Sequence, residues 1–184
     1  KVDAIVNAGD IAENGLLCEY QYISEKLAGA RTNCFLNAVG NHDVRLKASY
    51  KKTVRNFTGF TNELNKSVGS DFTIDSLHYS YEINGYRFIV LGTDRTEFEE
   101  SYISEAQLCW LDAQLTEASK TGKPIFVMIH QPLKWTHGLP DTWNSPIDSA
   151  GSVGAQSDSL KYFLNKYDNV FLITGHLHTG IGKF

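Results

Sequence analysis

The chain has 184 residues, of which 17 are Lys or Arg, 21 are Asp or Glu and 42% are hydrophobic. This is the size of one ordinary globular domain, and a chain of this length buries enough surface to form a core without disulfides. The formal net charge of −4 argues against a general nucleic-acid-binding surface, which would carry a basic excess, and no run of about 18 apolar residues could span a bilayer.

Short apolar runs alternate with segments of helical periodicity in the first third of the chain, the pattern of an α/β fold. Residues 2–8 form the first apolar run and predict a strand. Asn14 is expected to cap the helix that follows, because Asn is favoured at helix N-caps. Residues 34–39 predict a second strand, and residues 44–66 predict a helix with a break near Gly59.

The rest of the chain carries the clearest local signals. Two strand-like runs flank Asn84-Gly85 and predict a hairpin with a type I′ turn. Ser104 begins a capping-box pattern, which predicts the start of a helix that Gly122 closes. The remaining predicted elements are two strands and a helix, at residues 125–129, 170–174 and 157–166.

Three cysteines are far apart in the sequence and show no CxxC spacing, so no disulfide framework or zinc site is indicated. Each lies among apolar neighbours, and we expect all of them to be small buried thiols. They are Cys18, Cys34 and Cys109.

Four of the predicted strands end, at their C-terminal side, in polar residues of the kinds that bind metal ions. Those residues are Asp10, then Asn41 and His42, then His130, then His176 and His178. Open α/β sheets bind ligands at the carboxyl ends of their strands. We therefore expect these side chains to converge on one edge of the sheet.

Taken singly, each of these signals has a simpler explanation. A Gly-Asp pair after a strand is commonly just a turn, and a single His at a strand end is more often hydrogen-bonded than metal-bound. Four independent strand ends nevertheless supply one coherent set of ligand types. Their joint occurrence favours a metal site.

These strand ends resemble the motif blocks of the calcineurin-like metallophosphoesterases. Four of that family's five blocks are matched in order and approximate spacing, by Gly9-Asp10, Gly40-Asn41-His42-Asp43, His130 and Gly175-His176-Leu177-His178. The resemblance implies an α/β fold in which two mixed sheets are flanked by helices, a four-layer α/β/β/α sandwich. It covers essentially the whole chain, so residues 1–184 are expected to form a single but incomplete metallophosphoesterase catalytic domain.

The resemblance also implies roles for the metal-binding side chains. Asp10 would bridge two metal ions, because a carboxylate has two oxygens and can bind two cations about 3.5–4 Å apart. Asn41, His130 and His176 would complete the protein ligands of one metal, and His178 would bind the other. The implied cofactor is a pair of divalent or trivalent metal ions, and mixed nitrogen and oxygen ligands suit Mn, Fe or Zn without choosing among them. A hydroxide bridging the two ions would attack phosphorus.

His42 is implied to serve the reaction itself, by protonating the leaving group or stabilising its charge. Asp43 would orient the His42 ring and favour its protonated form. A role for Asp43 as N-cap of a helix beginning at residue 44 remains open beside it.

Four residues outside the motif cores are candidates for substrate binding. Arg45 would meet a substrate phosphate, as in relatives with the pattern Gly-Asn-His-Asp-x-Arg; a solvated helix residue is the alternative. Trp135, His137 and Trp143 lie in the long loop after His130, where they could stack on a base or an aromatic leaving group. A structural aromatic cluster is the alternative for these three.

The sequence departs from the family at both ends. The first block, Asp-x-His, is absent, because only nine residues precede Asp10 and no His follows Asp3 at the required spacing. We therefore expect an N- and C-terminally truncated part of a larger protein, which lacks the first strand and the C-terminal strands and has one incomplete metal site. The isolated fragment would be weakly active or inactive, and its unpaired strand edges would favour self-association.

The predicted function is metal-dependent hydrolysis of phosphomonoesters or phosphodiesters, with a small, nucleotide-like phosphoester favoured by the Trp-bearing loop. Purple acid phosphatase chemistry is disfavoured, because Glu13 stands where that branch has a Tyr ligand. One alternative is a catalytically degenerate metallophosphoesterase-like scaffold that acts as a protein-interaction module, and another is a structural protein with one metal ion. Degenerate scaffolds tend to lose ligands, whereas here every ligand position that the chain covers is filled.

Overall fold

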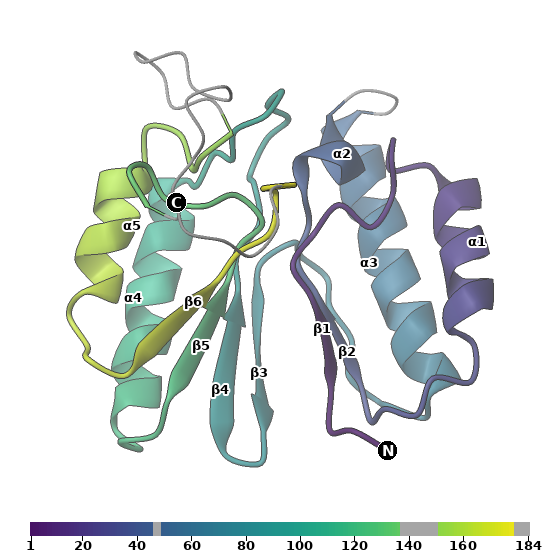
Figure 1. Ribbon diagram of the computed structural model, residues 1–184, viewed down its shortest axis with the longest axis horizontal. Helices are drawn as coiled ribbons and strands as arrows, with labels where there is room; N and C mark the ends of the chain where they lie inside the picture. Colours follow the sequence, from purple (N-terminus) through teal and green to yellow (C-terminus); the bar gives the residue numbers. More distant parts are fainter. Residues whose placement is uncertain (46–48, 137–150, 179–184) are drawn as a thin grey trace.

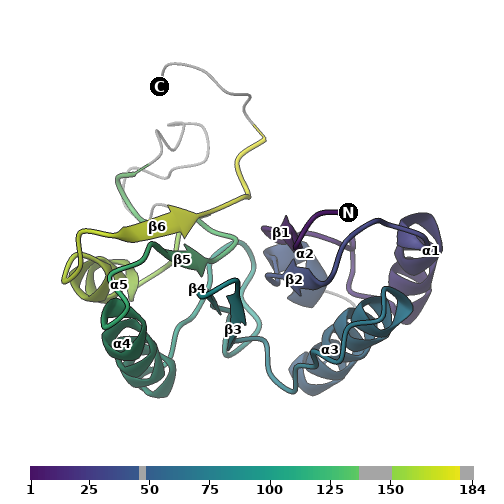
Figure 2. The same cartoon turned by 90° about the horizontal axis from the view of Figure 1, so that it is seen from below.

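The computed structural model describes residues 1–45, 49–136 and 151–178. Two β-sheets lie side by side between two pairs of helices, so the layers follow the order helices, sheet, sheet, helices (Figure 1, Figure 2). This confirms the four-layer α/β/β/α arrangement. The described elements are β1 (Ile5–Asn7), α1 (Leu17–Leu27), β2 (Phe35–Asn37), α2 (Asn41–Val44), α3 (Tyr50–Ser67), β3 (Tyr79–Ile83), β4 (Tyr86–Val90), α4 (Glu105–Ser119), β5 (Ile125–Met128), α5 (Ser157–Leu164) and β6 (Val170–Ile173).

The first sheet consists of the parallel strands β1 and β2, with Val6 opposite Leu36. Helix α3 packs on β2, and α1 packs on α3. The fully buried Asn65 of α3 fastens the helix to the strand: its Oδ1 accepts from the Phe35 N–H at 2.8 Å, and its Nδ2 donates to the Phe35 carbonyl at 3.1 Å. One side-chain amide thus satisfies two buried backbone groups that would otherwise need a neighbouring strand.

The second sheet is mixed and has the strand order β3-β4-β5-β6. Strands β3 and β4 are antiparallel, whereas β4, β5 and β6 run parallel to one another. Asn84 and Gly85 connect the antiparallel pair with φ of 53° and 78°, the left-handed conformation that a type I′ turn requires. The predicted hairpin is therefore confirmed.

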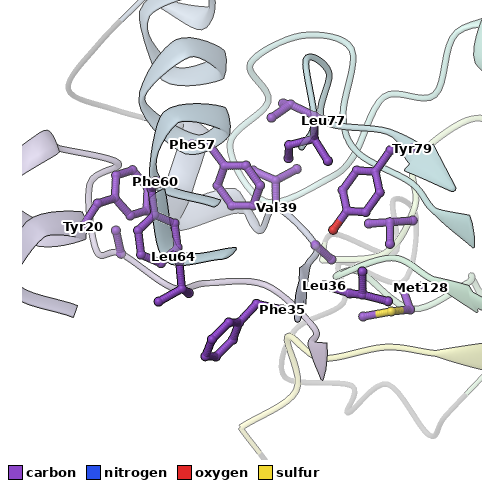
Figure 3. Packing of buried hydrophobic residues seen from close by; sticks show 14 of the residues in the cluster. Tyr20, Phe35, Leu36, Val39, Phe57, Phe60, Leu64, Leu77, Tyr79 and Met128 are labelled. Atoms are coloured by element: carbon purple, nitrogen blue, oxygen red, sulfur yellow. The ribbon is translucent and has the colours of Figure 1, made fainter. Parts of the chain in front are cut away.

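The second sheet contributes to two separate cores, because successive residues of a strand point to opposite faces. Ile89 and Val127 pack with α4 and α5 on the outer face, whereas Val90 and Met128 pack toward the first sheet. Figure 3 shows this inner cluster, in which side chains of α1 and α3 meet side chains of β2 and the second sheet. The labelled residues are Tyr20, Phe35, Leu36, Val39, Phe57, Phe60, Leu64, Leu77, Tyr79 and Met128.

A buried hydrogen-bonded pair also joins the two sheets. The Tyr79 hydroxyl of β3 accepts from the Asn37 N–H at 2.8 Å and donates to the Asn37 carbonyl at 2.9 Å. Because Asn37 is the last residue of β2, this contact fixes the C-terminal end of the first sheet against the second. The strand ends that carry the motifs are therefore held close together.

Two details of the helices differ from the expectations. Helix α3 continues through Gly59, since a single exposed glycine lowers helix propensity without ending the helix. Helix α1 begins after Leu16, so Asn14 is not its cap; instead Glu19 accepts hydrogen bonds from the backbone N–H groups of Leu16 and Asn14 at 2.9 and 3.1 Å. No helix in the described ranges combines the length and apolar character needed to cross a bilayer.

The cysteines follow their expectation only in part. Cys34 is buried, as predicted. Cys18 and Cys109 are exposed, because each lies on the outward side of its helix, α1 packing on α3 and α4 packing on the second sheet. Apolar neighbours in the sequence therefore do not imply burial on an amphipathic helix.

Candidate metal centre

The motif residues meet where the two sheets come together. Asp10 and Asn41 follow β1 and β2 of the first sheet, and His130 and His176 follow β5 and β6 of the second (Figure 1). Asp10, His130 and His176 come together at strand ends, but they do not lie on the edge of one sheet. They are divided between two, because the strands that carry them belong to different layers.

Three side chains form a compact group of metal-binding type. His130 Nε2 lies 3.0 Å from Asp10 Oδ2 and 3.1 Å from His176 Nδ1. One ligand atom from each of the three residues lies within 4.8 Å of the others. Both histidines are buried, with exposed fractions of 2% and 5%. Two imidazole nitrogens and a carboxylate oxygen at this separation can bind one metal ion.

The protonation states of this group suit metal binding. His130 Nδ1 lies 2.7 Å from the carbonyl of Ala8, which can only accept, so Nε2, which faces Asp10 and His176, is the nitrogen available to a metal ion. Burial and the neighbouring His130 lower the pKa of His176 to about 4, so its ring is neutral at neutral pH. Burial acts to raise the pKa of Asp10, but His130 and the N–H of His42 outweigh it and lower that pKa, so the carboxylate is ionised.

The side-chain amide of Asn41 gives a separate reason to expect a metal ion at this group. Its Nδ2 donates to Glu99 Oε2 at 2.8 Å, whereas its Oδ1 is buried and has no hydrogen-bond partner among the described residues. A buried carbonyl oxygen without a partner costs about 1–3 kcal/mol. Its neighbour His42 donates its backbone N–H to Asp10 Oδ1 at 3.0 Å, so Asn41 adjoins the carboxylate. A cation would satisfy this oxygen, and the residues present therefore fit a metal ion.

The backbone around the group explains the glycines of the motifs. Asp10 and His176 both adopt the left-handed conformation, with φ of 54° and 69°, which is uncommon outside glycine and is found where a site constrains the chain. A Cβ on Gly9 would lie 2.5 Å from His130 Nδ1, and a Cβ on Gly40 would lie 2.1 Å from Asp10 Oδ1. Each of these glycines is thus required because a neighbouring ligand occupies the space of its side chain.

His42 and Arg45 lie beside this group. His42 Nδ1 is 3.1 Å from Glu13 Oε1, 3.3 Å from the Glu13 carbonyl and 3.0 Å from Arg45 Nη2. Arg45 forms an ion pair with Glu99 at 2.7 Å, and its side chain is only 12% exposed. The alternative that Arg45 is a solvated helix residue is therefore wrong.

The expected role of Asp43 is also wrong. Its fully buried carboxylate accepts hydrogen bonds from the Ala12 and Gly40 N–H groups, both at 2.9 Å, and from the Tyr20 hydroxyl at 3.0 Å. These donors, and not the His42 ring, occupy its oxygens. Burial raises the pKa of Asp43 to about 6. Asp43 lies within α2, where its bond to Gly40 caps the first turn from inside, so it is not the N-cap of a helix beginning at residue 44.

The remaining candidate residues that the structure describes do not belong to the compact group of Asp10, His130 and His176. His178 is exposed and lies near enough to His176 to contribute to the lowering of its pKa, but it is not part of the compact group. Trp135 is 77% exposed on the loop after β5. His137 and Trp143 lie outside the described residues.

The sequence did not indicate Glu99, whose carboxylate accepts hydrogen bonds from both Asn41 and Arg45. It lies among other acidic residues in the stretch 94–100, and no motif distinguishes it from Glu97 or Glu100. Only the three-dimensional structure identifies it.

A sequence model of the family described as calcineurin-like phosphoesterase matches residues 1–180. The chain therefore belongs to this family of metallophosphoesterases.

Two curated relatives are similar in sequence. The glycerophosphodiester phosphodiesterase GpdQ of Enterobacter lignolyticus is 28% identical over 130 residues, which cover 71% of this chain and 42% of that protein. The probable glycerophosphodiester phosphodiesterase GpdQ of Arcobacter nitrofigilis is 26% identical over 181 residues, covering 97% of this chain and 57% of that protein. The chain thus spans about half the length of the curated relatives it matches.

Two solved structures share the fold. A purple acid phosphatase, PPD1, from seeds of yellow lupin (Lupinus luteus) superposes with a TM-score of 0.61 at 16% identity, over 96% of this chain and 30% of that one. A dimetal phosphatase from Danio rerio superposes with a TM-score of 0.54 at 16% identity, over 95% of this chain and 66% of that one. At this identity the likeness supports the fold alone.

Proposed function

We propose that residues 1–184 form a catalytic domain that hydrolyses small phosphoesters with the help of metal ions bound between its two sheets. The observation that carries this proposal is the compact group of Asp10, His130 and His176, beside the buried and unsatisfied Oδ1 of Asn41. Family membership supports the reaction class. Manganese, iron and zinc all suit these donors.

The chain's own residues have distinct tasks in this proposal. Asp10, Asn41, His130 and His176 hold one metal ion, and Asp10 and His178 contribute to a second. Bound metal ions supply Lewis-acid chemistry, which activates water for attack on phosphorus and neutralises charge on the phosphoryl oxygens. The ring of His176 is neutral and the carboxylate of Asp10 is ionised, and these are the protonation states that metal binding needs.

His42 is the proposed proton donor to the leaving alkoxide. Glu13 and Arg45 contact its Nδ1, which leaves Nε2 as the nitrogen that faces a leaving group. Its backbone N–H is bonded to Asp10, so the ring is tied to the residue that would hold the metal ions. Glu13, and not Asp43, is therefore the residue proposed to orient the His42 ring.

The proposed substrate is a small phosphodiester, with phosphomonoesters and nucleotide-like esters as the other candidates. The names of the two curated relatives support a diester of a small alcohol. Arg45 is the proposed contact for a phosphate oxygen, and Trp135, His137 and Trp143 are proposed contacts for the organic group. The exposed Trp135 ring offers an apolar face for that purpose.

Turnover of bis-p-nitrophenyl phosphate and p-nitrophenyl phosphate by the whole protein in the presence of Mn²⁺ tests the proposal, because the isolated chain is expected to be weakly active. Asp10→Ala should lose both Mn²⁺ binding and turnover. His42→Ala should keep Mn²⁺ binding and lose turnover, by about 10²–10⁴-fold for an alkyl leaving group and by less for p-nitrophenolate, which needs no proton. Wild-type turnover no greater than that of Asp10→Ala would reject hydrolysis and favour the protein-interaction scaffold.

A further inference from the structure

The carboxylate of Glu99 contacts both Asn41, in the Gly40-Asn41-His42-Asp43 block, and Arg45, two residues beyond that block. It lies in the segment between β4 and α4, where its Oε2 accepts from Asn41 Nδ2 at 2.8 Å and its Oε1 accepts from Arg45 Nη1 at 2.7 Å. Its side chain is 26% exposed, and that of Arg45 is 12% exposed. A charge-assisted contact of this kind, largely shielded from water, is stronger than a surface ion pair.

The contact with Asn41 decides which end of the amide faces the metal centre. The oxygen and nitrogen of an Asn amide are nearly equal in shape, so only hydrogen-bonding partners fix its orientation. An ionised carboxylate accepts hydrogen bonds and donates none. Glu99 therefore binds the NH₂ end and leaves Oδ1 on the other side, buried and without a hydrogen-bond partner in the part of the chain that the structure covers.

We propose that Glu99 is a positioning residue that fixes the Asn41 amide with its oxygen toward the metal centre. The proposal rests on the proposed function in assuming that a metal ion binds there. Without Glu99 the amide would be free to rotate, and a metal ion would meet either the oxygen or the NH₂ group. The cost would appear as weaker metal binding.

The same carboxylate sets the position of Arg45. Its guanidinium contacts Glu99 at one nitrogen and His42 Nδ1 at another, 3.0 Å away. The guanidinium of Arg45 also lies over the Phe98 ring, with Cζ 5.4 Å from the ring centroid. Glu99 thereby holds the guanidinium against the ring proposed as proton donor and offsets its positive charge beside a cation site.

The segment that carries Glu99 is itself anchored to the second sheet. The Glu99 carbonyl accepts from Gln131 Nε2 at 3.0 Å, and the Ser101 hydroxyl donates to Gln131 Oε1. Gln131 is buried and directly follows the candidate ligand His130. Glu99 therefore connects the Asn41 side of the centre to the His130 side.

Glu99→Gln tests the proposal, because glutamine keeps the size of the side chain but has a single acceptor oxygen in place of two. Glu97→Gln is the matched control: Glu97 lies in the same segment and is also paired with an arginine, Arg95, at 2.5 Å, but has no contact with the motif residues among the contacts of the described chain. The full chain is used, stripped of metal and titrated with Mn²⁺ by calorimetry.

Glu99→Gln should raise the Mn²⁺ dissociation constant by about 10–100-fold, the usual effect of removing a residue that orients a ligand. Glu97→Gln should stay within about twofold of the wild type, because an exposed ion pair contributes little. In the background of Arg45→Ala, Glu99→Gln should still weaken Mn²⁺ binding, since the contact of Glu99 with Asn41 does not depend on Arg45. Equal Mn²⁺ affinity in Glu99→Gln and Glu97→Gln would overturn the proposal.

A second measurement keeps the test independent of the proposed function. In the metal-free, ¹⁵N-labelled chain, the Asn41 side-chain amide protons should exchange with solvent at least about tenfold faster in Glu99→Gln than in the wild type or Glu97→Gln. Unchanged exchange would overturn the positioning role. A wild type that binds no Mn²⁺ would refute the metal-dependent function, while faster exchange in Glu99→Gln would still support the orientation of Asn41.

Discussion

The hydroxyl of Tyr20 donates a hydrogen bond to the carboxylate of Asp43, 3.0 Å away, and so joins α1 to the first turn of α2. The Asp43 oxygens also accept from the backbone N–H groups of Ala12 and Gly40. The two loops that carry Gly9-Asp10 and Gly40-Asn41-His42-Asp43 are therefore held together by one buried side chain. Asp43 stabilises the site without touching the proposed reaction path.

Asp43→Asn should lower the free energy of unfolding by about 2–4 kcal/mol, because an NH₂ group would face buried donors. Tyr20→Phe, which removes one donor, should cost only about 1 kcal/mol. Urea denaturation monitored by fluorescence measures both. If Asp43 oriented His42 instead, Asp43→Asn would leave stability unchanged and would alter the pH profile of turnover.

Gly40→Ala should disrupt the metal centre. The new Cβ would lie 2.1 Å from Asp10 Oδ1 and 2.4 Å from the Asp10 backbone nitrogen, so the carboxylate would have to move. We expect a loss of about 1–3 kcal/mol in stability and a loss of Mn²⁺ binding. Gly59→Ala is the control, since a Cβ there meets nothing within 4 Å and should stabilise α3 by about 0.5–1 kcal/mol. Thermal unfolding with and without Mn²⁺ distinguishes the two; intact Mn²⁺ binding in Gly40→Ala would contradict the steric account.

Glu19 should make stability depend on pH. Burial acts to raise its pKa, but the hydrogen bonds from Leu16 and Asn14 outweigh it and hold the pKa below its ordinary value of 4.5. A lowered folded-state pKa means that the stabilisation is complete above pH 4.5 and is lost as the pH falls through the folded value. Glu19→Gln should therefore cost about 0.5–1 kcal/mol at pH 7 and progressively less below pH 4.5. Chemical denaturation of the two chains between pH 7 and pH 3 provides the test, and a constant difference over this range would argue against it.

Metal binding should stabilise the fold. At a free Mn²⁺ concentration of about 100 times the dissociation constant, the free energy of unfolding should rise by about 2.7 kcal/mol. Chelation with EDTA should reverse the gain, and Asp10→Asn should show none. Differential scanning calorimetry measures the shift. A midpoint that does not respond to Mn²⁺ in the wild type would mean that the group around His130 binds no metal ion in the folded chain.

Much of the fold is encoded locally and was predictable. The apolar runs predict β1, β2, β5 and β6, and Asn84-Gly85 predicts the hairpin, because strand length and turn conformation depend on neighbouring residues. Ser104 caps α4, as its spacing indicates, by accepting from the Gln107 N–H. The break expected at Gly59 fails because α3 is held by packing along its whole length, which local propensity does not describe.

The candidate ligands were predictable because they stand at fixed offsets from strand ends. The supporting residues were not, since their partners are distant in the sequence. Asp43 reaches Ala12 and Tyr20, and Glu99 reaches Asn41 across 58 positions. Nothing in the sequence around Asp43 shows that its carboxylate turns away from the adjacent His42. The placement of His178 beside a second metal ion stays a prediction.

The division of the ligands between two sheets has a mechanical consequence. A cation bound by Asp10 and His176 would have one ligand from each sheet. Its distances to these ligands would therefore change if one sheet moved relative to the other. The Tyr79–Asn37 contact restrains such sliding near the same strand ends. A binding event far from the metal ions could therefore alter the chemistry by changing the alignment of the layers, without reaching a single ligand.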